Sequence, residues 1–257
     1  MRLRDRFAVI TGGASGIGAA TARLFATEGA RVAILDRDQQ AAESVAEEIR
    51  GSGGRAGAFL CDVSDEPAVR QAVDDAAALH GPITVLFNNA GIAIRRSVAE
   101  LDVRDWDQVI AVNLRGAFLC SKHCLRHFHD QGGSIIHASS VTGITGVRGR
   151  AAYSAAKGAL AALTRNMALD LAPRGIRVNC VCPGYVETAM QERELAWEAQ
   201  LRATSVHDVR RGYIDDTPLG RLQTPADVAA AIAFLASERA GAITGEALSV
   251  NGGSYMD

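Results

Sequence analysis

A tyrosine and a lysine four residues apart are the side chains of this chain whose types and spacing most suggest chemistry. Tyr153 and Lys157 lie in the segment Ala-Tyr-Ser-Ala-Ala-Lys-Gly, and on a helix this spacing places both side chains on one face. A phenol keeps its proton up to about pH 10, so alone it is a poor acid or base near neutrality. A nearby ammonium favours the phenolate and makes proton transfer accessible. The same spacing also occurs on solvated helix faces, so the rest of the chain decides the meaning of the pair.

A glycine-rich turn follows the first segment that has the composition of a buried strand. Residues 7–11 are apolar or β-branched, and residues 11–18 read Thr-Gly-Gly-Ala-Ser-Gly-Ile-Gly. Glycines let the backbone turn sharply and approach a pyrophosphate, while the N-terminus of the next helix offers unpaired N–H groups. The position of this turn, after a strand and before a helix, predicts a dinucleotide-binding site.

Two acidic residues end the next two predicted strands. Asp36 lies about 20 residues after the glycine-rich turn, where a carboxylate accepts hydrogen bonds from both ribose hydroxyls and repels a 2′-phosphate. This favours NAD over NADP, although Arg31 and Arg37 are nearby cations that would soften the preference. Asp62 follows the third strand, where it would either meet the adenine amino group or cap a turn.

Composition and charge exclude several classes of function. The formal net charge is -2, which gives no electrostatic basis for binding nucleic acid, and no basic run is long enough for a membrane surface. The apolar stretches are shorter than a membrane span, and the first residues run into a strand-like segment without a secretory apolar region. We therefore expect a cytoplasmic protein with no nucleic-acid or membrane partner.

The cysteines raise the question of a metal site. Five cysteines form no even framework and lie in apolar or helical segments, which predicts reduced thiols. Cys120 with Cys124, and His123 with His127, have a same-face helical spacing that would suit zinc. However, the two pairs point about 60° or more apart, and no second cluster of ligands lies nearby in sequence. A structural helix face is favoured, and no metal site is predicted.

Short apolar segments alternate with longer amphipathic ones along the chain. The expected strands cover residues 7–11, 31–35, 56–60, 83–87, 134–138, 176–181 and 247–250. The expected helices cover residues 17–28, 39–49, 68–79, 106–128, 151–171 and 226–237. This alternation predicts an α/β fold with a doubly wound parallel sheet of about seven strands and helices on both faces.

No linker or repeat divides the chain, so we expect one domain over residues 1–257. A polar, helix-prone insertion at about residues 187–217 departs from the alternation. In a doubly wound sheet, such an insertion lies near the carboxyl ends of the strands, where ligands bind. It would form either a lid or a surface decoration.

Five elements, in order along nearly the whole chain, resemble the short-chain dehydrogenase/reductase family. The glycine spacing of residues 11–18 is similar to the pattern of that family, and Asn-Asn-Ala-Gly at residues 88–91 resembles its element after the fourth strand. Pro-Gly at residues 183–184, followed by a threonine at 188, resembles its nicotinamide-side segment. The family's four catalytic positions are occupied by Asn113, Ser140, Tyr153 and Lys157. The resemblance implies a Rossmann-type fold and a nicotinamide cofactor.

The resemblance also implies a role for each catalytic residue. Tyr153 would be the general base in alcohol oxidation and the general acid in ketone reduction, while Lys157 would lower its pKa and hold the nicotinamide ribose. Ser140 would donate a hydrogen bond to the substrate oxygen; its neighbour Ser139 should face the other way because strand side chains alternate. Asn113 would hold a water that links Lys157 to solvent, or else simply bond to backbone.

The cofactor residues that the resemblance and the strand ends imply are Gly12, Ser15, Gly16, Ile17, Gly18, Asp36, Asp62, Val63, Asn89, Ala90, Gly91, Tyr153, Lys157, Pro183, Gly184, Val186 and Thr188.

Substrate choice would be set by the loop after residue 91, by residues 141–152 and by the insertion. The candidate substrate residues are Arg95, Thr142 and Arg150. A guanidinium directed into the cleft would bind a carboxylate or phosphate. The alternative for these arginines, and for Arg96, is a place at the surface or at a subunit contact.

We therefore predict an NAD-dependent oxidoreductase that transfers a hydride between a secondary alcohol and the nicotinamide, the alcohol being a polyol, a sugar or a hydroxy acid. One alternative is a reductase of 3-oxoacyl thioesters, whose NADP-linked members Asp36 disfavours. A remote alternative is a non-catalytic NAD-binding regulator, which would be expected to lack Tyr153 or Lys157. The resemblance further implies a homotetramer or homodimer that packs through the helices at 106–128 and 151–171.

Overall fold

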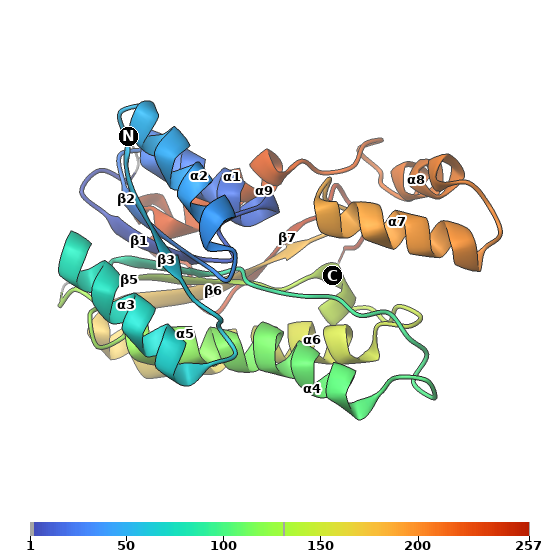
Figure 1. Cartoon of the computed structure of the whole chain (residues 1–257), viewed down its shortest axis with the longest axis horizontal. Helices are drawn as coiled ribbons and strands as arrows, with labels where there is room; N and C mark the ends of the chain where they lie inside the picture. Colours follow the sequence, from blue (N-terminus) through green and yellow to red (C-terminus); the bar gives the residue numbers. More distant parts are fainter. Residues whose placement is uncertain (1–2, 131, 257) are drawn as a thin grey trace.

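Within residues 3–130 and 132–256, which the computed structural model describes, seven parallel strands form one central sheet (Figure 1). The strands are β1 (Phe7–Thr11), β2 (Arg31–Asp36), β3 (Arg55–Leu60), β4 (Val85–Asn88), β5 (Gly133–Ala138), β6 (Ile176–Pro183) and β7 (Ala247–Val250). Their spatial order is β3-β2-β1-β4-β5-β6-β7. The order reverses between β1 and β4, so a crevice opens at the carboxyl ends of these two strands. The predicted fold class is confirmed.

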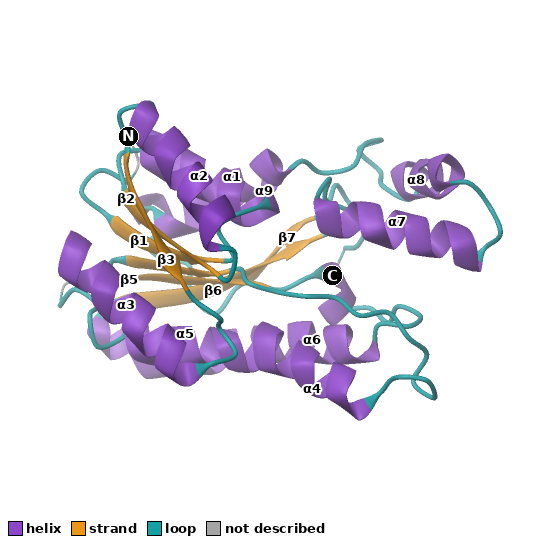
Figure 2. Cartoon of the chain, in the orientation of Figure 1, coloured by secondary structure: helices purple, strands orange, loops and turns teal. Residues whose placement is uncertain are grey.

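Helices cover both faces of the sheet (Figure 2). One face carries α1 (Gly16–Thr27), α2 (Gln39–Gly51) and α9 (Pro225–Ala236). The other face carries α3 (Glu66–His80), α4 (Val103–Ile110), α5 (Gly116–Cys124) and α6 (Ala151–Leu171). Short 3-10 turns occur at η2 (Val141–Gly143), η3 (Ala172–Arg174) and η4 (Glu238–Ala240).

Strand β1 shows why the sheet needs both layers. All five of its residues are buried, and they alternate between two apolar cores. Ala8 and Ile10 pack into the core that contains α1, α2 and α9. Phe7 and Val9 pack into the core that contains residues of α3, α5 and α6. A strand that is apolar on both faces is stable only between two layers of helices.

The helix predicted over residues 106–128 is interrupted by a π-helical turn. After α4, the segment η1 (Ala111–Arg115) is π-helical, and α5 continues the same path until Cys124. The wider turn re-aims the side chains on it, and such turns are frequent at functional sites. Asn113 lies in its middle. The sequence carried no signal for this interruption.

Several other boundaries differ from the prediction by a few residues, and two of them have a visible cause. β4 begins at Val85 rather than at residue 83, because Ile83 forms an isolated bridge with Phe128 beyond the end of α5. α3 begins at Glu66 rather than at residue 68, with a proline in its first turn, where the missing N–H costs no hydrogen bond.

The insertion at residues 187–217, called the lid segment below, contains two helices. α7 (Ala189–Leu201) and α8 (Val206–Asp215) pack on each other and project beyond the carboxyl ends of the strands (Figure 1). They have a small apolar core of their own, which includes Leu195, Val209 and Tyr213. That the segment moves as a lid stays a prediction.

The cysteine and histidine cluster on α5 lies in a packed helix layer. All five cysteines are buried, and none of them forms a disulfide bond. His123 Nε2 lies 3.0 Å from Glu66, and His127 Nε2 lies 2.7 Å from Asp74. Over the described part of the chain, no group of three His, Cys, Asp or Glu side chains is arranged to hold a metal ion. In that same part, no helix is both long and apolar enough to cross a membrane.

Candidate functional site

A cleft of about 1190 Å³ opens where the strand order reverses, between the ends of β1, β4, β5 and β6 and the lid segment. Most of the predicted site residues line it, from the glycine-rich turn through Ser140 and Tyr153 to Thr188. Two do not. Gly18 and Asn113 lie behind the surface of the cleft, where they shape the segments that line it.

The glycine-rich turn is folded too tightly for side chains. Gly12 has a φ of +61°, and a β-carbon there would lie 2.8 Å from the Cα atom of Ala90. A β-carbon on Gly18 would lie 2.1 Å from the carbonyl oxygen of Gly12. The start of α1 therefore folds back against β1, and the cleft wall is backbone at this point.

Two hydrogen-bonded loops form the floor across the switch point. The Oγ1 atom of Thr11 accepts from the N–H groups of Asn89 (3.0 Å) and Ala90 (3.1 Å). In return, Nδ2 of Asn89 donates to the carbonyl oxygens of Thr11 (3.0 Å) and Gly12 (2.9 Å). The glycine-rich turn and the Asn-Asn-Ala-Gly segment are therefore one rigid unit, although they lie nearly 80 residues apart (|i−j| = 77 to 79).

Asp36 stands at the rim of this unit. Its Oδ2 atom accepts from the N–H of Ala14 at 3.0 Å, and its Oδ1 atom accepts from the N–H of Asp38 at 3.1 Å. A carboxylate has further acceptor capacity beyond these two bonds, so it remains able to bind ribose hydroxyls. Asp62 caps a turn, since its Oδ1 atom accepts from both the N–H and the hydroxyl of Ser64, and these bonds lower its pKa. A contact of Asp62 with the adenine amino group stays a prediction.

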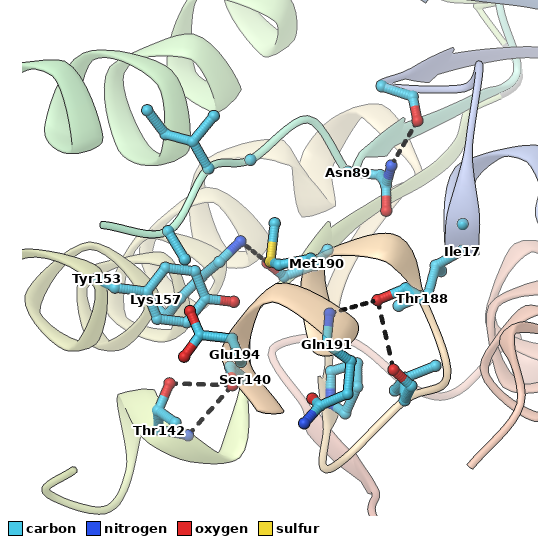
Figure 3. A pocket seen from close by; sticks show the side chains of 18 of the residues that line it. Ile17, Asn89, Ser140, Thr142, Tyr153, Lys157, Thr188, Met190, Gln191 and Glu194 are labelled. Atoms are coloured by element: carbon cyan, nitrogen blue, oxygen red, sulfur yellow. Dashed lines mark hydrogen bonds between the residues drawn. The ribbon is translucent and has the colours of Figure 1, made fainter. Parts of the chain in front are cut away.

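The catalytic candidates come together at the ends of β5 and α6 (Figure 3). Ser140 follows β5, and its Oγ atom accepts from the N–H (3.2 Å) and the hydroxyl (3.0 Å) of Thr142. Ser139 does face the other way, because its hydroxyl donates to the carbonyl of Lys157 at 2.8 Å. Thr142 thus orients Ser140 through two hydrogen bonds.

Tyr153 is half-buried, and burial raises the pKa of its phenol. The guanidinium of Arg150 and a hydrogen bond from Ser140 lower that pKa, while the carboxylate of Glu194 raises it. Arg150 contributes because its Cζ atom lies 5.8 Å from the centre of the Tyr153 ring. The sequence predicted that Lys157 would supply the lowering charge, whereas in the structure Arg150 is the cation that lowers this pKa.

Lys157 is buried one turn along α6. Its Nζ atom lies 5.5 Å from the centre of the Tyr153 ring and donates to the carbonyl of Ala138 at 2.6 Å. Burial lowers the pKa of Lys157 to about 8. This ammonium is therefore poised to exchange a proton near neutral pH.

Asn113 uses its whole side chain to hold one loop. Its Oδ1 atom accepts from the N–H of Ile92, and its Nδ2 atom donates to the carbonyl of Ile92, both at 2.8 Å. A β-carbon on Gly91 would lie 3.2 Å from Asn113 Oδ1 and 3.5 Å from Lys157 Nζ, so both groups converge on Gly91. Asn113 does bond to backbone, but to a segment 21 residues away in sequence and not to the local helix backbone foreseen as the alternative. Its role in holding a water stays a prediction.

Four charged side chains, called the Arg–Glu cluster below, join the lid segment to the body of the protein: Arg95, Arg150, Glu194 and Glu198. Nη1 of Arg95 lies 3.0 Å from Oε2 of Glu194 and 3.1 Å from Oε2 of Glu198. Nη2 of Arg150 lies 2.5 Å from the same Oε2 atom of Glu194. The hydroxyl of Tyr213 donates to Oε2 of Glu198. The arginines proposed as substrate residues therefore line the cleft already paired with carboxylates.

Comparison with known proteins shows the family to which the chain belongs. A family model described as enoyl-(acyl carrier protein) reductase matches residues 12–255. The cis-4-hydroxycyclohexanecarboxylate dehydrogenase of Sinomonas cyclohexanicum is 46% identical over 251 residues, 97% of this chain and 96% of that protein. The meso-2,3-butanediol dehydrogenase of Serratia marcescens is 40% identical over 254 residues, 99% of this chain and 96% of that protein.

A solved structure agrees with these relatives. A double mutant of a Serratia marcescens short-chain dehydrogenase/reductase matches with a TM-score of 0.89 and 36% sequence identity, covering 99% of both chains. The chain belongs to the short-chain dehydrogenase/reductase family. The predicted family and the predicted reaction class, an oxidoreductase acting on CH–OH groups with a nicotinamide cofactor, are confirmed.

The cleft of this dehydrogenase/reductase fits a dinucleotide in its cofactor half. No described side chain caps the first turn of α1 at Ser15, so the N–H groups of that turn are free for a pyrophosphate. The first turn also carries no acidic residue to repel phosphate. A cradle made of backbone, with Asp36 at its rim, is what a dinucleotide requires.

Sequence reasoning missed the acidic half of the Arg–Glu cluster. Glu194 and Glu198 are four residues apart on α7, so they share a helix face, which is a signal that the sequence did contain. Trp197 was missed as well, and its ring lies 4.0 Å below the guanidinium of Arg95. A pair of glutamates inside a polar insertion does not indicate by itself which arginines it will meet.

Proposed function

We propose that this protein is an NAD-dependent dehydrogenase that oxidises a neutral, hydroxylated secondary alcohol. The observation that carries the proposal is the convergence of Ser140, Tyr153 and Lys157 on one cleft whose opposite end is a backbone cradle with Asp36 at its rim. Asp36 supports NAD over NADP because a 2′-phosphate would meet its carboxylate. The residues proposed to hold the cofactor are those of the glycine-rich turn, the Asn-Asn-Ala-Gly segment, Lys157, and Pro183, Gly184, Val186 and Thr188.

The side chains divide the work of proton transfer. Tyr153 takes the proton from the substrate hydroxyl as that oxygen becomes a carbonyl, and Ser140 donates a hydrogen bond to the same oxygen. Ser140 is held for this task by Thr142. Bound nicotinamide supplies the hydride acceptor for this chemistry. Lys157 stands between Tyr153 and the buried Asn113–Ile92 contact, so we assign it the exchange of that proton with solvent.

The choice of a neutral substrate rests on the Arg–Glu cluster. One relative is named for a hydroxylated carboxylate and another for a neutral diol, so the family resemblance alone does not decide. A free guanidinium in the cleft would favour an anion. Here Arg95 and Arg150 already bind Glu194, so a substrate carboxylate would have to compete with a carboxylate of the protein.

Two other functions are less well supported. A reductase of 3-oxoacyl thioesters would use NADPH in its biosynthetic form, which Asp36 opposes. A non-catalytic NAD-binding regulator would have no need of Tyr153 and Lys157, and both are in place beside Ser140.

The location and the assembly of the protein are also proposals. We keep the cytoplasm as the location, which fractionation of cells would test. A homotetramer, or failing that a homodimer, is supported by the exposed apolar side chains Val103 and Trp106 on α4, Phe118 on α5 and Leu169 on α6. Light scattering at micromolar concentration tests this assembly, and a monomer would contradict it.

The function is tested by initial rates of NADH and NADPH formation from neutral polyols and sugars, hydroxy acids and 3-hydroxyacyl thioesters. We expect the highest rate with NAD and a neutral polyol or sugar. Tyr153→Phe should lower this rate by about 10² to 10⁴ while NAD affinity stays nearly unchanged, because only the proton transfer is lost. Tyr185→Phe is the matched control, since its ring stacks on Tyr213 at 4.0 Å and phenylalanine preserves that contact. Near-normal turnover by Tyr153→Phe would reject the assignment.

A further inference from the structure

Glu194 is the carboxylate of the Arg–Glu cluster that faces the reacting groups. It projects from α7 into the space beside Tyr153 and Ser140 (Figure 3). Its charge also reaches the phenol, because it raises the pKa of Tyr153. Only 10% of the Glu194 side chain is exposed to solvent, so it is held in a largely buried wall of the cleft.

The two oxygen atoms of Glu194 have different surroundings. Oε2 binds both Arg95 and Arg150. Oε1 receives no hydrogen bond from any residue in the described part of the chain, and it is not among the atoms there that are sealed from solvent without a partner. An oxygen of this kind opens into the cleft, and an ionised carboxylate can only accept hydrogen bonds. Its natural ligand is a hydroxyl or N–H donor on the substrate.

The charges around Glu194 restrict that donor further. Each guanidinium group here already has a carboxylate partner: Arg95 and Arg150 pair with Glu194, Arg95 also pairs with Glu198, and Arg202 pairs with Glu198. A carboxylate on the substrate would meet the Oε1 lone pairs of Glu194. A hydroxyl group donates to Oε1 without bringing a charge into this wall.

We propose that Glu194 is a specificity-determining residue that accepts a hydrogen bond from a second hydroxyl group of the substrate. This deepens the function proposed above and rests on it. The reacting hydroxyl binds Ser140 and Tyr153, and the second hydroxyl binds Oε1 of Glu194. The enzyme therefore selects diols and polyols over alcohols that have a single hydroxyl, because a single hydroxyl fills the cleft without donating a hydrogen bond to Oε1.

Glu198 supplies the matched control. It lies one turn along α7, belongs to the same cluster and also lines the cleft. Both of its oxygen atoms are already taken, Oε1 by Arg202 and Oε2 by Arg95 and Tyr213. Removing either glutamate leaves arginine charge unbalanced, but only Glu194 offers an open acceptor.

The experiment compares kcat/KM, at saturating NAD, for two pairs of substrates that differ by one hydroxyl: butane-2,3-diol with butan-2-ol, and cyclohexane-1,4-diol with cyclohexanol. The wild-type enzyme should prefer the diol in at least one pair. Glu194→Ala should lower that preference by about tenfold to a hundredfold, the range expected for a lost charged hydrogen bond. Glu198→Ala should retain the wild-type preference, whatever it does to the absolute rates.

Three outcomes would overturn the inference. They are a wild-type enzyme without diol preference in either pair, a Glu194→Ala enzyme that keeps the preference, and a Glu198→Ala enzyme that loses it equally. The isosteric Glu194→Gln replaces the alanine variant if that chain does not fold, with a partial loss of preference expected. Failure of the proposed function looks different, since the wild-type enzyme would then oxidise neither member of any pair.

Discussion

At the glycine-rich turn, backbone atoms approach until there is no room for a β-carbon, whereas at the lid segment the opposing walls are joined by charged side chains. The first arrangement is set by residues 11–18 and their contact with Asn89 and Ala90. The second is set by two arginines and the glutamates that follow them in sequence, 99 and 103 residues after Arg95 and 44 residues after Arg150. The cofactor half of the cleft therefore tolerates changes of surface charge but not added side-chain atoms. The substrate half tolerates added atoms but is sensitive to changes of charge.

A pair of glycine variants puts this comparison to its strongest test. Gly18→Ala places a β-carbon about 2 Å from the carbonyl oxygen of Gly12, which forces the turn apart. We expect a loss of about 4 kcal/mol or more in the free energy of unfolding and at least a hundredfold weaker NAD binding. Urea denaturation and titration of NADH fluorescence measure the two effects.

Gly212→Ala is the counterpart in the lid segment. Gly212 lies in α8, and a β-carbon there would have no atom within 4 Å. Alanine favours the helix, so the free energy of unfolding should rise by about 0.5 to 1 kcal/mol. Equal effects of the two substitutions would refute the difference between the halves.

The fold and the cofactor half were predictable for a common reason. Strands such as residues 7–11 are apolar on both faces, and helices follow them at regular spacing, so short segments carry the information. The glycine-rich turn and Asp36 are likewise recognised within one βαβ unit. Each of these signals spans fewer than about 30 residues of sequence.

The substrate half depends on contacts that no short segment contains. Arg95 and Arg150 were interpreted as free cations because their partners lie on α7, which the sequence showed only as a polar insertion. The π-helical turn at Asn113 was also unpredictable, since it is fixed by the contact with Ile92 rather than by composition. Tertiary contacts decide both features, and the π-helical turn has no marker in the local pattern.

The carboxylate of Asp36 is a charged group at the rim of the cofactor half, next to a wall that is formed by backbone. Asp36→Ala removes the carboxylate and leaves Arg37 and the free N–H of Ala14 beside the ribose position. The ratio of kcat/KM for NAD over that for NADP should fall by about a hundredfold, because repulsion of a 2′-phosphate costs several kcal/mol. Asp38→Asn is the control, because asparagine can still cap α2 at this position. An unchanged ratio in Asp36→Ala would show that backbone alone sets cofactor choice.

Lys157 belongs to both halves, and its burial has a consequence for stability. Its pKa in the folded protein, about 8, lies below the ordinary value of 10.5. Between these values the unfolded chain holds a proton that the folded chain has released, so Lys157 contributes an increase in the free energy of unfolding as the pH rises above about 8. The buried cysteines Cys61, Cys120 and Cys124 contribute in the opposite direction, because burial raises the pKa of their thiols. From pH 7 to pH 9.5 the rise attributable to Lys157 should be about 2 kcal/mol.

Urea denaturation across this range, in the absence of cofactor, measures the slope. Lys157→Met should remove this contribution of about 2 kcal/mol, seen as the difference between the wild-type and variant slopes, because methionine has no proton to release. Lys122→Met, which changes a lysine at the surface, should keep it. The upper limit of pH 9.5 matters because burial raises the pKa of Tyr153, so a further loss of stability begins once tyrosines of the unfolded chain ionise near pH 10. If Lys157→Met retained the wild-type slope, the ammonium of Lys157 would be solvated in the folded state. Water would then reach the point where the cofactor and substrate halves of the cleft meet.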